Sequence, residues 1–357
     1  MKVAIYKEKG RVEIEETPIP TPASYEVLIR VSACAICASD ISRIYYDTAV
    51  PGVVLGHEWV GVVERTGDCV SHLKPGDRVV AGGGSQPVPA VPPVSPNDPP
   101  PAPKAIQGAR ARHSPRDNGR TCFPGTNEQG GFAEYLLRKA WRLAKVPDEL
   151  SDFQAAACEP LAVAIHAVRL SGVMLGDTVA VFGLGAIGLF VVQCAKLQGA
   201  AKIVAVDPDP FRRELATRYG ADTVIDPNAC DALDAVVAAA GGNGPLIAYE
   251  CAGAPDTLQQ AMECVTFGGK VVLVAARWTP TSVTPVEWLG REPQLLFSYS
   301  YGTMGWPMAI HLQAKGLVTI DGMVGENHVF PLYRLQEALE HARNHVNNVI
   351  KAIIVPS

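Results

Sequence analysis

A glycine-rich turn between an apolar strand and an apolar helix is the feature that most restricts the fold of this chain. Residues 178–182 (TVAVF) form a continuous apolar run, as expected for a strand buried on both faces of a parallel sheet. The turn at 183–188 (GLGAIG) follows, and 189–197 continue as an apolar helix. A Gly-x-Gly-x-x-Gly motif alone is weak evidence, but between a strand and a helix it indicates a dinucleotide-binding unit.

The positions of this turn have separate predicted tasks. Gly183 makes the tight turn, Gly185 lets backbone amides approach a pyrophosphate, and Gly188 allows the helix to pack closely. Ala186 and Ile187 open the helix, whose dipole attracts phosphate groups. We therefore predict that these five residues bind the cofactor.

An acidic residue ends the next predicted strand, 203–206, about twenty positions after the motif. The carboxylate of Asp207 is expected to accept hydrogen bonds from ribose hydroxyls and to repel a 2′-phosphate, which predicts NAD rather than NADP. Arg212 and Arg213 lie in the following helix. The default interpretation is that they belong to its solvated face; the alternative is that their positive charge weakens the preference for NAD over NADP. Further strand-like runs, each paired with a helical stretch, predict a doubly wound α/β domain; they lie at 223–225, 246–249 and 270–274.

The first 81 residues have a different pattern, with short strands separated by turns. Prolines at 18, 20 and 22 and the PGD turn at 75–77 punctuate them, which favours an antiparallel, barrel-like domain. A chain of 357 residues exceeds the size of one hydrophobic core, so two domains are expected. We predict a β-rich domain over residues 1–158 and a nucleotide-binding domain that begins at residue 159.

Composition narrows the class of protein. The net charge of −5 gives no support for nucleic acid or anionic membranes as partners, and no apolar run approaches the roughly 20 residues of a membrane span. The N-terminus alternates like a strand, unlike a signal peptide. Nine scattered cysteines are typical of reduced thiols. These observations predict a cytoplasmic protein with a small-molecule substrate.

The segment from about 82 to 120 interrupts the first domain. Nine of the seventeen residues at 87–103 are proline, and a basic stretch follows, so the segment is expected to be extended. A solvated or oligomer-covering loop is the favoured interpretation. A proline-rich motif that binds a partner and a basic patch that attracts an anionic substrate are the alternatives.

A histidine–glutamate pair in the first domain begins a longer pattern. Residues 56–58 (GHE), followed by Gly61, Gly67 and Val70, resemble the zinc-containing alcohol dehydrogenase signature of the medium-chain dehydrogenase/reductase family. The resemblance covers the chain apart from the segment near 82–120. It implies a chaperonin-10-like β-barrel catalytic domain at 1–158, a Rossmann domain at 159–296 and a return to the catalytic domain at 297–357. It also implies NAD as the cofactor, and assembly as a homodimer or homotetramer.

The resemblance also implies a metal site. Cys37, His57 and Glu159 match positions that hold one catalytic zinc with an open position for the substrate. The sequence at 159–162 (EPLA) looks like the polyol, sorbitol-type branch, in which glutamate replaces a second cysteine ligand; Cys158 is the competitor. A second, structural zinc is not expected, because the four-cysteine lobe of many relatives is reduced to Cys122.

Cys34 and Cys37 also form a Cys-x-x-Cys pair, which has other interpretations. A redox pair or half of a structural zinc site is possible, but the chain has no second pair and no thioredoxin-like surroundings. We therefore expect Cys34 to be a buried packing residue.

The residues around the metal have implied roles in catalysis. The resemblance assigns Ser39 as the first proton acceptor and Asp40 as the carboxylate that bonds the far nitrogen of His57, with Glu58 as an exchangeable ligand. Ser42 stands where many relatives carry a histidine that relays the proton.

Together these features predict a zinc-dependent NAD(H) oxidoreductase that interconverts a secondary alcohol, within a polyol, sugar or sugar derivative, and its ketone. Alternatives are a dehydrogenase of a simple alcohol or hydroxy amino acid, a metal-free quinone or enoyl reductase, and a non-catalytic NAD-binding protein.

Overall fold

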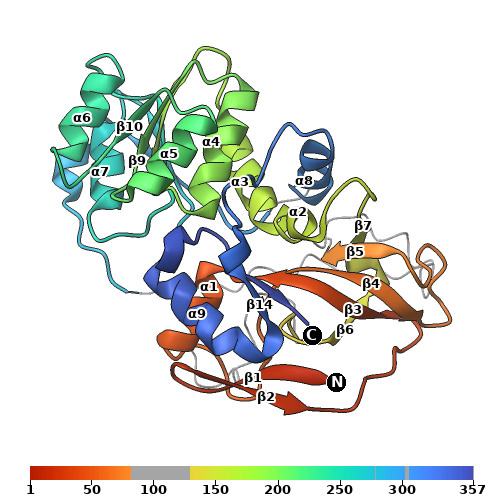
Figure 1. The fold of residues 1–357 in the computed structure, drawn as a ribbon. Coiled ribbons are helices and arrows are strands. Elements are labelled where there is room, and N and C mark those ends of the chain that lie inside the picture. Colours follow the sequence, from red (N-terminus) through yellow and green to blue (C-terminus); the bar gives the residue numbers. More distant parts are fainter. Residues whose placement is uncertain (82–128, 278, 302–304, 357) are drawn as a thin grey trace, which may run out of the picture. The chain divides into compact units, whose positions relative to one another are not determined.

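The protein divides into two compact units (Figure 1). The structure is a computed structural model and describes residues 1–81, 129–277, 279–301 and 305–356. The first unit comprises Met1–Ala156, Glu326–Asn347 and Ala352–Ser357, and the second Ala157–Gly325 and Asn348–Lys351. The change of unit after Ala156 lies beside the predicted boundary at 158, whereas residues 297–325 stay with the second unit.

The first unit is β-rich. Its strands are β1 (Lys2–Glu8), β2 (Arg11–Glu16), β3 (Glu26–Ala35), β4 (Glu58–Thr66), β5 (Arg78–Ala81), β6 (Tyr135–Lys139), β7 (Leu143–Lys145), β14 (Val329–Pro331) and β15 (Ile353–Val355), and its helices are α1 (Ala38–Tyr45), α2 (Asp152–Ala156) and α9 (Leu335–Asn344). Within the described residues the main sheet has the order β14-β15-β3-β4-β5-β7, and β6 also pairs with β3. All of these pairs are antiparallel except β14 with β15, so the predicted antiparallel architecture is confirmed.

Strands β3 and β4 lie at the centre of this sheet, and their side chains are buried on both faces. Val27, Leu28 and Ile29 of β3 are fully buried, and Trp59 and Val60 of β4 are at most 1% exposed. Gly61 lies opposite Val31, where an added Cβ would stand 2.5 Å from the carbonyl oxygen of Arg30. The two strands therefore approach each other too closely for a side chain at this position.

The second unit is a doubly wound α/β fold. Its strands are β8 (Thr178–Phe182), β9 (Lys202–Val206), β10 (Thr223–Ile225), β11 (Ile247–Glu250), β12 (Lys270–Leu273) and β13 (Gln294–Phe297), and its helices are α3 (Cys158–Ser171), α4 (Ala186–Gln198), α5 (Pro210–Arg218), α6 (Ala232–Ala239), α7 (Thr257–Cys264) and α8 (Gly305–Ala314). The described strands are parallel in the order β10-β9-β8-β11-β12-β13, which is the Rossmann order. Helices cover both faces of the sheet (Figure 1).

Strand β8 contains the apolar run at 178–182, in which apolar and polar residues do not alternate because both faces of the strand are covered. Ala180 and Phe182 pack into one core cluster with Val236 of α6 and Met262 of α7. Val179 and its neighbours at alternate positions point to the other face and are equally buried. The prediction of a strand covered on both faces is confirmed.

The chain before and after Ala157 forms two separate helices. Ser151 caps the first of them, α2, because its Oγ accepts a hydrogen bond from the Gln154 N–H at 3.2 Å. The chain then breaks at Ala157 and α3 begins at Cys158, so Pro160 lies in the first turn of a new helix and does not end the earlier one. Proline is tolerated there because the first N–H groups of a helix have no partner within it.

The proline-rich segment, its basic stretch and Cys122 lie outside the described residues. Among the helices that are described, none combines the length and apolarity needed to cross a membrane.

Substituting Gly61→Ala tests the close approach of β3 and β4. The new methyl group would meet the Arg30 carbonyl oxygen and Ile29 Cγ2, both at 2.5 Å. Overpacking of this kind costs about 1–3 kcal/mol of the free energy of unfolding, and we expect a melting temperature several degrees lower by calorimetry. Gly290→Ala is the control, because an added Cβ there has nothing within 4 Å. Equal melting temperatures for the two variants would contradict this packing.

Candidate metal centre

The pairing of β3 with β4 brings two distant parts of the chain to one place. Ala35, the last residue of β3, lies opposite Glu58, the first residue of β4. Cys37 follows Ala35 by two residues and is the N-cap of α1, and His57 directly precedes β4. The antiparallel register therefore sets a thiol beside an imidazole and a carboxylate.

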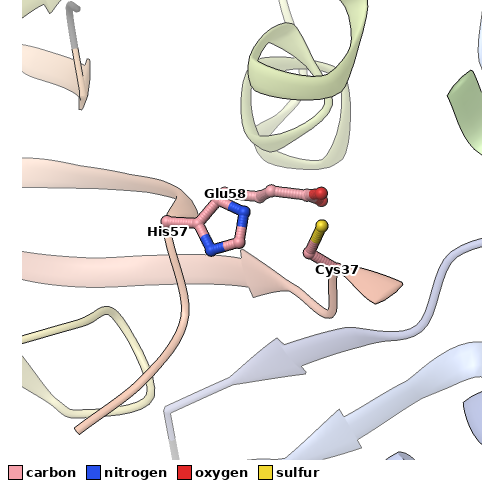
Figure 2. Close-up of side chains that lie close together, drawn as sticks. All are labelled: Cys37, His57 and Glu58. Atoms are coloured by element: carbon pink, nitrogen blue, oxygen red, sulfur yellow. The ribbon is translucent and has the colours of Figure 1, made fainter. Parts of the chain in front are cut away.

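Figure 2 shows the side chains of Cys37, His57 and Glu58 converging. The sulfur, one imidazole nitrogen and one carboxylate oxygen all lie within 4.8 Å of one another. The carboxylate is fully buried, and such a group is costly to bury unless hydrogen bonds or a cation receive it. The arrangement suits a divalent cation.

Asp40 holds this cluster together from the first turn of α1. Its Oδ2 accepts a hydrogen bond from the Cys37 N–H at 3.0 Å, and its Oδ1 accepts one from the Gly56 N–H at 3.3 Å. Oδ1 also lies 3.5 Å from His57 Nδ1. Cys37 is the N-cap of α1, and Asp40 completes a capping box three residues later.

The charges around Asp40 and His57 reinforce each other. Burial raises the pKa of Asp40, but the neighbouring His57 outweighs it, and a backbone hydrogen bond and Arg43 add to this, so the net pKa is lowered. Burial lowers the pKa of His57, but Asp40 and Cys37 more than compensate, and the net pKa lies well above its usual value.

Arg43 of α1 is a charged neighbour of Asp40 that the sequence analysis did not identify. Its side chain is buried, with 6% of the residue exposed. The signal was present as the spacing of three residues between Asp40 and Arg43, which sets an acid and a base on one helix face.

Glycine is needed beside the cluster. Gly56 has φ +92°, and an added Cβ would lie 2.8 Å from Cys34 Sγ and 2.9 Å from the Phe132 ring. Cys34 is fully buried, as expected of a packing residue. The thiol therefore supports the turn that carries His57.

The donor set fits zinc. Thiolate sulfur, imidazole nitrogen and carboxylate oxygen are the ligands that Zn²⁺ takes in proteins, at about 2.0–2.3 Å. The buried Oγ of Ser39, two residues after Cys37, has no hydrogen-bond partner among the described residues. A polar atom left in this state beside the cluster is available to a bound molecule.

Glu159 lies in the first turn of α3 and is 9% exposed. It belongs to the second unit, so its part as a third ligand stays a prediction. Its competitor Cys158 is held otherwise: Gln313 Nε2 donates to its sulfur at 3.1 Å, and burial raises the pKa of the Cys158 thiol to about 12. The hydrogen bond from Gln313 engages the sulfur within the second unit, which favours Glu159 over Cys158 as the predicted ligand.

The glycine-rich turn of the second unit has the backbone that a pyrophosphate site requires. Gly183 has φ +86°, and Gly188 packs so closely that an added Cβ would lie 1.8 Å from the Gly183 carbonyl oxygen. Gly185 is the N-cap of α4, and an added Cβ there meets nothing within 4 Å. Ala186 and Ile187 form the first turn of α4 behind this open space. Their roles in binding a cofactor remain predictions.

Asp207 is anchored at the end of β9. Its Oδ2 accepts a hydrogen bond from the Leu184 N–H at 2.7 Å, and its Oδ1 accepts one from the Asp209 N–H at 2.9 Å. Arg213 donates to the Asp207 carbonyl oxygen at 2.7 Å and pairs with Asp226 at 3.0 Å. Arg212 Nη1 lies 4.0 Å from Asp207 Oδ2, so a cation does lie beside this carboxylate.

Comparison with known proteins agrees with both halves of this description. Residues 23–148 match the family described as alcohol dehydrogenase GroES-like domain, and residues 186–315 match that described as zinc-binding dehydrogenase. Sorbitol dehydrogenase of Ovis aries is 32% identical, over 94% of this chain and 91% of the relative. The chain belongs to the zinc-dependent alcohol dehydrogenase superfamily, near its polyol dehydrogenase branch.

Other relatives of this dehydrogenase share its full length. (R,R)-butanediol dehydrogenase of Bacillus subtilis (strain 168) is 32% identical over 91% of each chain. The structure of a zinc-binding dehydrogenase from Sinorhizobium meliloti 1021 bound to NADP has a TM-score of 0.82 and 28% identity, and the match covers 99% of each chain. The protein is thus an alcohol dehydrogenase whose cofactors are zinc and a nicotinamide dinucleotide, and the predicted fold of a GroES-like and a Rossmann domain is confirmed.

Replacing Asp40 by asparagine tests how the cluster is held. The variant loses the charge that orients His57, and we expect zinc affinity to fall about 10–100-fold in a competition with a chelator. Asp77→Asn is the matched control, because Asp77 also accepts a backbone hydrogen bond, from Lys74 at 2.9 Å, but lies away from the cluster on a turn of the same unit. Unchanged zinc affinity in the Asp40 variant would contradict the assigned role.

Proposed function

We propose that this dehydrogenase interconverts a secondary alcohol within a polyol or sugar-derived compound and its ketone, with NAD as the hydride carrier. The observation that carries the proposal is the convergence of Cys37, His57 and Glu58 within 4.8 Å. The Oγ of Ser39, two residues after Cys37, is buried and has no hydrogen-bond partner in the part of the chain that the structure describes. Relatives named as sorbitol and butanediol dehydrogenases act on compounds of this class. We propose Cys37, His57 and Glu159 as the zinc ligands and Glu58 as an exchangeable one.

The chemistry divides between the cofactors and the protein. Bound zinc supplies a Lewis acid that lowers the pKa of a hydroxyl group, and the nicotinamide accepts the hydride. A carboxylate in place of a second thiolate gives the metal a harder environment, which suits a substrate rich in hydroxyl oxygens. This favours a polyol over a simple alcohol.

The protein's own residues position the substrate and receive its proton. Ser39 Oγ is the first acceptor, since it is buried, lies two residues from Cys37 and is unpaired among the described residues. Asp40 keeps His57 oriented through Nδ1, which leaves the other ring nitrogen for the metal. Ser42, not a histidine, follows on the same helix, so the onward route of the proton differs from that implied by the family.

The preference for NAD over NADP rests on Asp207. Its carboxylate is 4% exposed and is fixed by two backbone N–H groups, so it cannot swing away from a 2′-phosphate. Arg213 is already engaged with Asp226. Arg212 reduces the repulsion, and we therefore expect a preference for NAD that is not absolute. The cytoplasmic location and the homodimer or homotetramer stay predictions.

A substrate panel tests the proposal. With zinc-loaded protein and NAD, we expect NADH formation from open-chain polyols and 2,3-butanediol, and much less from a primary alcohol or threonine. Ser39→Ala should lower kcat about 100-fold or more, because proton transfer contributes at least that much to comparable reactions. Ser32→Ala, on β3, is the matched control. Absence of zinc-dependent activity on every secondary alcohol, with either NAD or NADP, would refute the proposal.

A further inference from the structure

The loops at the carboxyl edge of the Rossmann sheet touch one another across its centre. Strands β8 and β11 are neighbours, and the Cys251 N–H donates to the Phe182 carbonyl oxygen at 2.8 Å where they end. An added Cβ on Gly183 would lie 2.6 Å from the backbone nitrogen of Ala252. The loop after β11 therefore abuts the glycine-rich turn after β8.

Glu250 holds this loop from within the unit. Its side chain is 1% exposed, and Oε1 accepts hydrogen bonds from the N–H groups of Ala252 at 3.0 Å and Gly253 at 2.7 Å. The Thr257 hydroxyl donates to the same oxygen at 2.8 Å. A buried carboxylate with three such donors fixes the turn that begins α7.

Arg277 holds the same loop from the loop that follows β12. Its Nη1 donates to the Gly253 carbonyl oxygen at 2.7 Å, and its Nε donates to the Thr279 carbonyl oxygen at 3.2 Å. Gly253 also packs against the loop after β12, since an added Cβ would lie 3.4 Å from Ala275 Cβ. Gly253 is thus held on both sides, its N–H by Glu250 and its C=O by Arg277.

We propose that Arg277 is a positioning residue for the nicotinamide half of the cofactor. The first half of the sheet, β8 to β10, carries the glycine-rich turn and Asp207, which leaves the loops after β11 and β12 to bind the other mononucleotide. The guanidinium joins these two loops by a charge-assisted bond. Loops already held in their bound arrangement cost less to order when the cofactor arrives.

The inference rests on the proposed function and is tested by comparing two ligands. ADP occupies only the first half of the site, whereas NADH needs both. We would measure the Kd of each by calorimetry with the full-length protein, and kcat and KM for NAD with the best substrate. The variants are Arg277→Ala, Arg277→Lys and a control, Arg291→Ala.

Arg291 is a matched control because it makes the same kind of bond elsewhere. Its Nη1 donates to the Val265 carbonyl oxygen at 3.0 Å, just before β12 and β13 begin, at the amino edge of the same sheet. Its loss should lower the melting temperature without changing either Kd.

For Arg277→Ala we expect NADH to bind about tenfold more weakly, the size of one lost hydrogen bond to a charged group, with an equal rise in KM for NAD. The Kd of ADP and kcat should be unchanged. Arg277→Lys should fall between this variant and the wild type, since lysine donates to a carbonyl oxygen but lacks the planar fork. It serves as the test variant should the alanine variant fail to fold.

Four outcomes would overturn the inference. NADH binding to Arg277→Ala, or to Arg277→Lys if only that variant folds, with wild-type affinity would show that the clamp has no role in cofactor binding. Equal weakening of ADP and NADH would indicate general damage to the glycine-rich turn, as would an Arg291→Ala effect of the same size. If the wild-type protein bound neither NADH nor NADPH, this result would contradict the proposed function and, with it, this inference.

Discussion

The register between β3 and β4 is the constraint on which the metal centre depends. It sets Ala35 opposite Glu58, and the residues just beyond these two positions supply the thiol and the imidazole. A shift of one residue would turn every side chain of one strand to the other face and separate them. Close packing at Gly61 and the buried side chains of Val60 and Ile29 fix that register. The chemistry therefore depends on the core of the sheet as much as on the ligands.

Asp40 connects this fold to the chemistry. It satisfies the N-terminus of α1 through Cys37 and bonds the turn at Gly56, while its charge faces His57. Buried polar groups with all their partners present rigidify a site, because each alternative arrangement leaves one of them unsatisfied. One carboxylate thus sets the orientation of two predicted ligands.

Much of this arrangement follows from local sequence. The period-free apolar run at 178–182 and the glycines after it predicted the Rossmann unit, because a doubly covered strand and a tight turn leave few other folds. The break between α2 and α3 was not predicted, since Pro160 is equally compatible with ending one helix and with starting another. Cys37 as a helix cap was missed for a similar reason: cysteine is not among the residues that favour this position, and the capping box depends on tertiary contacts of Asp40. The hydrogen bond from Arg277 to the Gly253 carbonyl oxygen could not be predicted from residue spacing or composition, because it joins two loops of the fold that are 24 residues apart in the sequence.

Zinc X-ray absorption spectroscopy of the loaded enzyme would count the sulfur ligands of the metal and so show whether Cys37 binds it. We expect one sulfur at about 2.3 Å, from Cys37, with the remaining ligands nitrogen or oxygen at about 2.0–2.2 Å. Two sulfur ligands would place Cys158 on the metal instead of Glu159. A spectrum with no sulfur ligand would contradict the assignment of Cys37, and with it the site described at the end of β3.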